Sequence, residues 1–329
     1  MKQIVVVVLV LMLNSCDWGK GSSYDPTKIQ QELDEEFGKY EEEVKSEDKE
    51  YYQAYNQTLS LWNTPYHEVH VPTSHGKAHV IVSGPKSGEP LVLLHGMNAS
   101  STMWYPNVKA LSQHYRVYAI DYLLEPGKSQ MNKEIGDMDD LMNWYHEVFE
   151  GLKLEEFSLI GASEGGWLAV RNALRQESRV KRLILLSPLQ TFIWIPPGLK
   201  MSHNITYSIA PKREDLRDVL STMSTQVDEM EQAYIDQYFI ATQIAEKRLL
   251  MFKMTPFSDD ELKSLTMPIL VLIGDQDIVN KEKSLENAKE LLPKVETGTI
   301  KDAGHFLSMD QPKIVNKWML EFLKANSIE

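Results

Sequence analysis

The sequence has little that would support a disulfide framework, a cysteine metal site or a nucleic-acid surface. Cys16 is its only cysteine, so it can form neither an intramolecular disulfide nor a cysteine-based metal site. Lysine and arginine total 34 against 47 aspartates and glutamates, which gives a net charge of −13. Because phosphate binding needs clustered basic side chains, nucleic acid is not an expected partner. The 9 histidines show no metal-ligand spacing, and we expect neither a metal nor another cofactor.

A hydrophobic run long enough to cross a bilayer is missing at the N-terminus. The apolar run at residues 4–13 follows Lys2 and is shorter than the about 20 residues that a spanning helix needs. A positive start and a short apolar core are typical of a secretory signal. The ending Leu13-Asn14-Ser15-Cys16 resembles the lipobox of bacterial lipoproteins, in which the cysteine is lipidated.

These features predict a signal peptide at residues 1–15 and a lipid anchor on Cys16. The protein would then be held outside the cytoplasm, on a bacterial membrane. The alternatives are an ordinary cleaved signal with an incidental cysteine, or a buried first strand.

Residues 16–61 have a composition unlike that of the rest of the chain. A Gly- and Ser-containing stretch at 17–25 is typical of a flexible tether, and the acidic stretch at 26–61 favours a helix. We expect a solvated helical segment that spaces the following domain from the membrane. The alternative is a docking element for a partner.

Residues 62–329 alternate between apolar runs and helical patterns. Short apolar runs predict buried strands at 91–94, 117–120, 157–160, 183–186 and 269–273, after a hairpin formed by 67–71 and 77–83. Helices are expected at 108–114, 138–152, 166–175, 283–292 and 314–324. Such alternation predicts an α/β domain with a doubly wound, mostly parallel sheet, whose site lies at the carboxyl ends of the strands.

One interval, at about 190–262, contains no convincing parallel strand. Helical patterns around 213–223 and 229–248 suggest a helical cap inserted over the site, with a peripheral decoration as the alternative. Phe192, Trp194, Pro196, Met201, Met223 and Met230 make this interval apolar. Their side chains favour an apolar substrate group, although such residues more often serve packing.

The motif Gly161-Ala162-Ser163-Glu164-Gly165 stands between the predicted strand at 157–160 and a helix. This placement is typical of a nucleophile elbow, a tight turn that projects a serine oxygen above the sheet. Ser163 is therefore the candidate nucleophile.

The other groups needed for acyl transfer follow in chain order. Asp275-Gln276-Asp277 ends the last apolar run, and we expect Asp277 to orient the base while Asp275 shapes the turn. Asp302-Ala303-Gly304-His305 lies before the final helix, which makes His305 the candidate general base.

Together these motifs resemble the α/β-hydrolase family, in its capped, esterase-like branch, over residues 66–329. The resemblance implies that His95 braces a His-Gly turn and that the backbone N–H groups of Met97 and Glu164 form the oxyanion hole. Residues 121–129 depart from the family's Asp-x-x-Gly-x-Gly-x-Ser turn by an extra residue and a missing glycine. An acidic Glu164 is also unusual there, and we expect its side chain to point away from the nucleophile.

The function expected from these residues is that of a serine hydrolase that cleaves a carboxylic ester or related acyl bond through an acyl-enzyme. A carboxylesterase-like enzyme (EC 3.1.1) acting on a small, apolar ester-like molecule is the first interpretation. Amide and C–C bond hydrolysis are alternatives. A ligand-binding or scaffold protein with an idle triad is the alternative from another class.

Overall fold

A computed structural model describes residues 24–42, 44, 46–195, 207, 210–245 and 254–326. The predicted signal peptide, Cys16, and the residues Pro196 and Met201 lie outside the described residues. Within the described ranges, no helix combines the length and apolar character that crossing a membrane requires.

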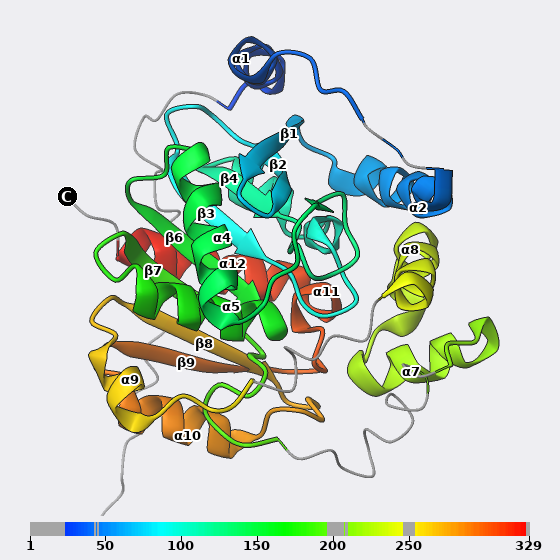
Figure 1. Ribbon diagram of the computed structural model, residues 1–329. Helices are drawn as coiled ribbons and strands as arrows, with labels where there is room; N and C mark the ends of the chain where they lie inside the picture. Colours follow the sequence, from blue (N-terminus) through cyan, green and yellow to red (C-terminus); the bar gives the residue numbers. More distant parts are fainter. Residues whose placement is uncertain are drawn as a thin grey trace, which may run out of the picture.

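Nine strands of the described chain form one sheet (Figure 1). Their bounds are β1 Tyr66–Thr73, β2 Gly76–Ser83, β3 Glu89–Leu94, β4 Tyr115–Ile120, β5 Gln130–Met131, β6 Phe157–Ala162, β7 Val180–Leu186, β8 Ile269–Gly274 and β9 Val295–Ile300. Their order is β1-β2-β4-β3-β6-β7-β8-β9, and β5 pairs with β2. Pairing is parallel from β4 to β9 and antiparallel around β2. The predicted fold class, a mostly parallel α/β sheet, is confirmed.

The central strands β4, β6 and β8 are buried along their whole length, which explains their continuous apolar sequences. The edge strand β9 was not identified from the sequence. Its residues Val-Glu-Thr-Gly-Thr-Ile are mostly half-buried or exposed, so it lacks the apolar run that marks the other strands.

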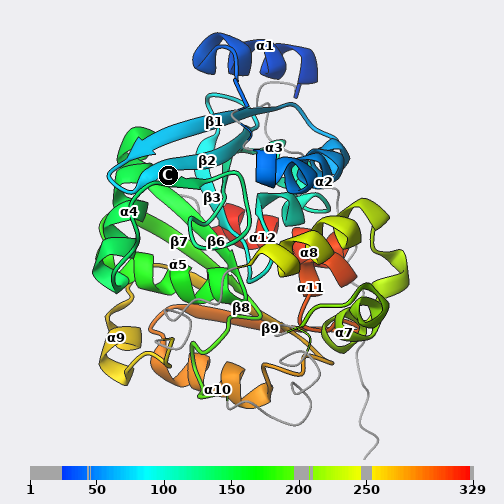
Figure 2. The same ribbon diagram turned by 45° about the vertical axis from the view of Figure 1, so that its right-hand side comes forward.

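Helices cover both faces of the sheet (Figures 1 and 2). The α-helices are α1 Pro26–Phe37, α2 Lys49–Leu59, α3 Val108–Ser112, α4 Met138–Gly151, α5 Glu164–Arg175, α7 Leu216–Met223, α8 Gln232–Ile244, α9 Asp259–Ser264, α10 Glu282–Leu291, α11 Leu307–Asp310 and α12 Pro312–Ala325. Val92 and Leu94 of β3 belong to the core under α4, α5 and α10. Leu91 and Leu93 belong to the opposite core, under α3 and α12. The alternation of side chains along the strand thus builds two apolar layers.

The two described helices of the N-terminal segment pack onto the domain, so the expectation that the acidic stretch is a solvated spacer was wrong. Residues 17–23 of the predicted tether lie outside the described residues. Helix α1 buries Ile29 and Leu33 in one core, and α2 buries Tyr51, Tyr55 and Leu59 in the other. Most acidic residues of these helices are exposed, although Glu36 pairs with the buried Arg116, and the tyrosines of α2 are buried. The many acidic residues of the stretch suggested a solvated helix, but the apolar face of each helix determines whether it packs onto the domain.

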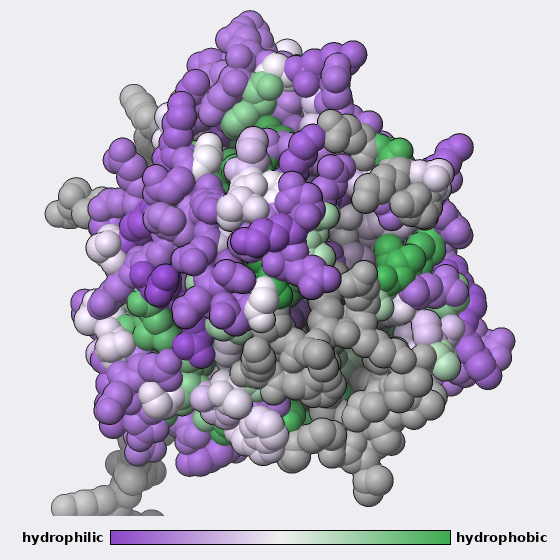
Figure 3. Space-filling model, in the orientation of Figure 1, coloured by the Kyte–Doolittle hydropathy of each residue, from purple (hydrophilic) through white to green (hydrophobic). Residues whose placement is uncertain are grey.

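The described part of the 190–262 interval is helical. Helices α7 and α8 follow β7, and α8 lies beside α2, as both ribbon views show. In the view of Figure 3, the surface over α4 and α5 is largely hydrophilic, whereas apolar surface lies over α8.

Candidate active site

Ser163 occupies a strained turn between β6 and α5. Its φ of 53° and ψ of −116° place a non-glycine residue in a backbone region that L-residues rarely adopt. The turn is held from both sides, because the Ser163 N–H donates to the Leu186 carbonyl at 2.9 Å and its carbonyl accepts the Gly166 N–H at 3.0 Å. The strain is therefore supported by the sheet, and the side chain is presented at its carboxyl edge.

The two glycines that flank Ser163 allow this turn to form. A Cβ on Gly161 would overlap the carbonyl oxygen of Gly165, and a Cβ on Gly165 would overlap those of Leu94 and His95. Helix α5 thus starts in direct contact with the end of β3. This close approach brings Ser163 next to the turn that follows β3.

The structure brings the three predicted side chains together. The Nε2 atom of His305 lies 2.8 Å from Ser163 Oγ, and its Nδ1 lies 3.1 Å and 3.3 Å from the two carboxylate oxygens of Asp277. Ser163 follows β6, Asp277 follows β8, and His305 follows β9. Parallel strands end at one edge of the sheet, which is why residues up to 142 positions apart meet there.

The charge of Asp277 sets the proton positions on His305. Burial by itself would raise the pKa of Asp277, but His305 and the N–H groups of Val279 and Asn280 outweigh burial and hold that pKa below its usual range. An ionised carboxylate only accepts hydrogen bonds, so His305 Nδ1 carries the proton. Its Nε2 is then free to accept the hydrogen of the Ser163 hydroxyl.

The acid and base loops also hold each other. The carboxylate of Asp275, which we expected to shape its own turn, accepts the N–H of Ala303 in the base loop at 3.2 Å. Gln276 donates its N–H to the Ala303 carbonyl at 2.9 Å. Sequence reasoning did not identify Asp310, whose carboxylate accepts the Gly304 N–H at 2.7 Å next to His305.

The His95-Gly96-Met97 turn lies against Ser163, since a Cβ on Gly96 would sit 3.3 Å from the Ser163 Cβ. The Tyr122 N–H donates to His95 Nε2 at 2.9 Å, and a backbone N–H can only donate. His95 Nδ1 therefore carries the proton and donates to the Gly96 carbonyl at 2.9 Å. Burial lowers the pKa of His95, in agreement with this neutral form. His95 thus braces the turn, as the resemblance implied.

The residues expected around the substrate differ in placement. Glu164 is buried at the start of α5, where burial and then the Glu164 charge raise the pKa of the Tyr145 hydroxyl on α4. Phe192 and Met230 are packed into the two cores, while Trp194 is 59% exposed. Most of the described apolar side chains of the insertion therefore serve packing, and they give no direct measure of substrate polarity.

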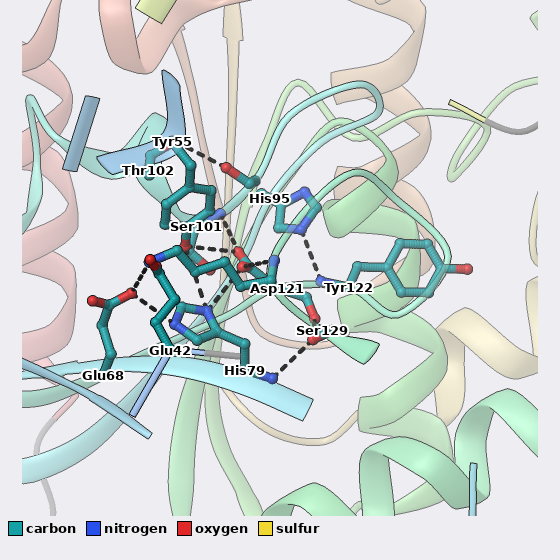
Figure 4. Close-up of polar contacts among 12 residues, drawn as sticks. Glu42, Tyr55, Glu68, His79, His95, Ser101, Thr102, Asp121, Tyr122 and Ser129 are labelled. Atoms are coloured by element: carbon teal, nitrogen blue, oxygen red, sulfur yellow. Dashed lines mark hydrogen bonds and ion pairs between the residues drawn. The ribbon is translucent and has the colours of Figure 1, made fainter. Parts of the chain in front are cut away.

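A buried group of charges lies behind the His95 turn (Figure 4). His79 bridges Asp121 and Glu68, with nitrogen–oxygen distances of 2.9 Å and 3.0 Å. Burial would lower the pKa of His79, but Asp121 and Glu68 outweigh burial and raise it. The sequence analysis assigned no role to this histidine, because its partners lie on other strands and loops. In the described ranges, no set of three potential ligands has the geometry of a metal site.

A sequence model of the alpha/beta hydrolase family matches residues 91–318. Two curated proteins of Bacillus subtilis strain 168 are each 34% identical to the chain. The uncharacterized carboxylesterase nap aligns with 84% of this chain and 93% of its own length, and the carboxylesterase YbfK aligns with 83% and 93%.

Solved structures give the same result. The naproxen esterase (carboxylesterase NP) from Bacillus subtilis superimposes with a TM-score of 0.79 at 33% identity, covering 85% of this chain and 99% of the esterase. A meta-cleavage product hydrolase, at 22% identity and a TM-score of 0.68, shares the fold.

Proposed function

Because the chain belongs to the alpha/beta hydrolase family and is a hydrolase, we propose that it is a serine carboxylesterase that uses Ser163 as its nucleophile. The observation that carries this proposal is the 2.8 Å contact between Ser163 Oγ and His305 Nε2 at a strained elbow, with Asp277 on the other side of the imidazole. The carboxylesterase relatives support an ester as the substrate.

In the first half of the reaction, His305 Nε2 takes the proton of Ser163 as its oxygen attacks the ester carbonyl carbon. Asp277 stabilises the imidazolium that forms. Backbone N–H groups of Met97 and Glu164 hold the oxyanion of the tetrahedral intermediate. When the intermediate collapses, the C–O bond to the alcohol breaks and the imidazolium gives its proton to the leaving alkoxide.

In the second half, water loses a proton to His305 and attacks the acyl carbon. The second tetrahedral intermediate collapses with return of the proton to Ser163 Oγ. The carboxylic acid leaves and the enzyme is restored. No cofactor is needed at any step of this scheme.

The experiment that tests the proposal compares wild type with Ser163→Ala on short-chain p-nitrophenyl esters. We expect kcat to fall by about 10⁴-fold or more, because the remaining groups alone give little acyl transfer. Ser187→Ala is a matched control, since Ser187 also lies directly after a strand and has a positive φ. It should retain most of the activity.

A fluorophosphonate probe gives a second readout on the same proteins. Wild type and Ser187→Ala should be labelled, whereas Ser163→Ala should not. Labelling that persists in Ser163→Ala, or ester hydrolysis at the wild-type rate, would exclude Ser163 as the nucleophile.

The lipid anchor is a separate proposal, which rests on the sequence around Cys16. Diacylation at Cys16 would hold the enzyme on an extracytoplasmic membrane face, near small apolar esters. Labelled palmitate should be incorporated into wild type and not into Cys16→Ser, and equal incorporation would contradict the anchor.

A further inference from the structure

Lys128 is a completely buried cation in the loop after β4. Its ammonium lies 2.6 Å from a carboxylate oxygen of Glu68, on β1, and 2.6 Å from one of Glu42, in the N-terminal segment. Three rings of that segment surround the ammonium, with ring centres 4.7 Å away for Tyr55, 5.7 Å for Tyr40 and 5.8 Å for Tyr52. Residues 40–55 therefore supply most of the described environment of this charge.

Lys128 is connected to Asp121 in two ways, directly and through Glu68 and His79. Its backbone N–H donates to Asp121 Oδ2 at 2.8 Å. Its partner Glu68 also contacts His79, which contacts the same Asp121 oxygen (Figure 4). Because both ring nitrogens of His79 face carboxylates, this histidine is held as a cation. The cluster thus ties the start and the end of the 121–129 loop together.

The same loop holds the turn that carries Met97. Asp121 Oδ1 accepts the Ser101 N–H at 2.8 Å, and Tyr122 donates to His95 as described above. Glu125 accepts the N–H of Asn98 at 2.7 Å, one residue after Met97. Figure 4 shows His95, Ser101 and Asp121 side by side in this arrangement. The turn is therefore attached to the 121–129 loop on both sides of Met97, through His95 before it and Asn98 after it.

We propose that residues 40–55 of the N-terminal segment position the oxyanion turn, and that Lys128 is the positioning residue through which they act. This inference rests on the proposed serine-esterase function. The segment precedes residues 91–318, which the family model matches. A donor displaced by a fraction of an ångström stabilises the transition state less while substrate binding changes little.

The contact between the Glu42 side-chain oxygen and the Lys128 ammonium is the part of this arrangement that is most readily altered. A buried cation is tolerated only when it is paired and hydrogen-bonded. Without Glu42, the described ion-pair partner left to Lys128 is Glu68, which it shares with His79. The ammonium of Lys128 would then move toward water. This movement would displace the Lys128 backbone and, with it, the 121–129 loop.

The chain offers a matched control in Glu36. Glu36 also belongs to the N-terminal segment, its side chain is 26% exposed against 30% for Glu42, and it pairs with Arg116, whose side chain is 2% exposed. Each acid has one exposed polar partner as well, Lys86 for Glu36 and Asn56 for Glu42. Arg116, however, lies at the amino end of β4, away from the oxyanion turn.

The test compares full-length Glu42→Ala with Glu36→Ala. We expect Glu42→Ala to lower kcat for p-nitrophenyl acetate by about tenfold with KM within about twofold of wild type. The Ki of a trifluoromethyl ketone, which forms an oxyanion on Ser163, should rise by a similar factor. Glu42→Gln keeps an oxygen acceptor for the ammonium and should restore most of kcat. Glu36→Ala should lose thermal stability to a similar degree and keep the kcat of wild type.

Equal kcat and Ki values in Glu42→Ala and Glu36→Ala, with both proteins folded by circular dichroism, would overturn the inference. So would a loss confined to KM. If Glu42→Ala fails to fold, Glu42→Ser, which also removes the carboxylate from Lys128, carries the same comparison against Glu36→Ser. Wild type and Ser163→Ala are assayed in parallel. An active Ser163→Ala protein contradicts the proposed function, whereas an inactive one beside an unaffected Glu42→Ala contradicts this inference alone.

Discussion

The carboxylate of Asp310 accepts the backbone N–H of Gly304 at 2.7 Å, one residue before the proposed base His305. The same carboxylate accepts the Ser224 hydroxyl and, at 3.1 Å, the Thr225 N–H, both just after α7. In addition, the Phe306 N–H donates to the Met223 carbonyl at 3.0 Å. Asp310 thus joins the base loop to the inserted helices.

This relationship predicts that Asp310→Ala lowers kcat by about tenfold and destabilises the protein by about 1–3 kcal/mol. The substitution leaves buried N–H groups without their acceptor and loosens the loop that carries His305. The check is steady-state kinetics together with urea unfolding. Ser224→Ala removes one contact to Asp310 but keeps the Gly304 bond, and it should change kcat far less. Equal kcat values in Asp310→Ala and Ser224→Ala would show that the hydrogen bond between Asp310 and Gly304 does not affect catalysis.

The two aspartates of the acid loop should differ in their effects. Asp277→Asn replaces the ionised acceptor of His305 by an amide that can reverse the imidazole tautomer, and we expect a loss of about 10⁴-fold in kcat. Asp275→Asn keeps an oxygen acceptor for the Ala303 N–H and should retain most of kcat. Initial rates with one p-nitrophenyl ester measure both. A larger loss of kcat in Asp275→Asn than in Asp277→Asn would show that Asp275, and not Asp277, orients His305.

Gly165 should tolerate no side chain, although it is helical. Its Cβ would overlap the carbonyl oxygens of Leu94 and His95, so Gly165→Ala must push α5 away from β3 and displace Ser163. We expect a destabilisation of about 2 kcal/mol and loss of fluorophosphonate labelling. Gly136→Ala, whose Cβ would meet only the flexible Asp140 side chain, is the control and should keep both properties. Full labelling of Gly165→Ala would contradict the tight contact.

The buried histidine makes stability depend on pH. The pKa of His79 is raised in the folded protein, so its charged form stabilises the fold below the unfolded value of about 6.5. This stabilisation is lost as pH rises through the folded pKa. His79→Gln should therefore cost on the order of 3 kcal/mol near pH 5.5 and progressively less toward alkaline pH. Thermal unfolding from pH 5.5 to 9 measures the difference, and 0.5 M salt should change it little because the pairs are buried. A difference that grows with pH would refute the charged state.

Part of the candidate site was predictable because short sequence motifs mark it. Ser163 lies between glycines that only a tight strand–helix turn requires, and His305 follows the small pair Ala303-Gly304. Each motif stands directly after a strand or before a helix. Parallel strands then bring these ends together whatever lies between them.

Other residues could not be assigned in this way. Lys128, His79 and Glu42 look like ordinary surface charges in the sequence, and their ion-pair partners are up to 86 positions away, as for Lys128 and Glu42. The N-terminal segment was misread as solvated for the same reason, since its tyrosines need the surface of the domain to become buried.

The sequence by itself determined the α/β class, the order of the candidate residues Ser163, Asp277 and His305, and the strained turn that carries the proposed nucleophile, because strand burial and turn chemistry depend on neighbouring residues. Only the tertiary structure decided which charges are buried and which loops contact the turn at His95. The physical reason is that a charged side chain is buried only when it has ion-pair and hydrogen-bond partners. Here these partners come from distant segments, so a local sequence pattern cannot indicate them.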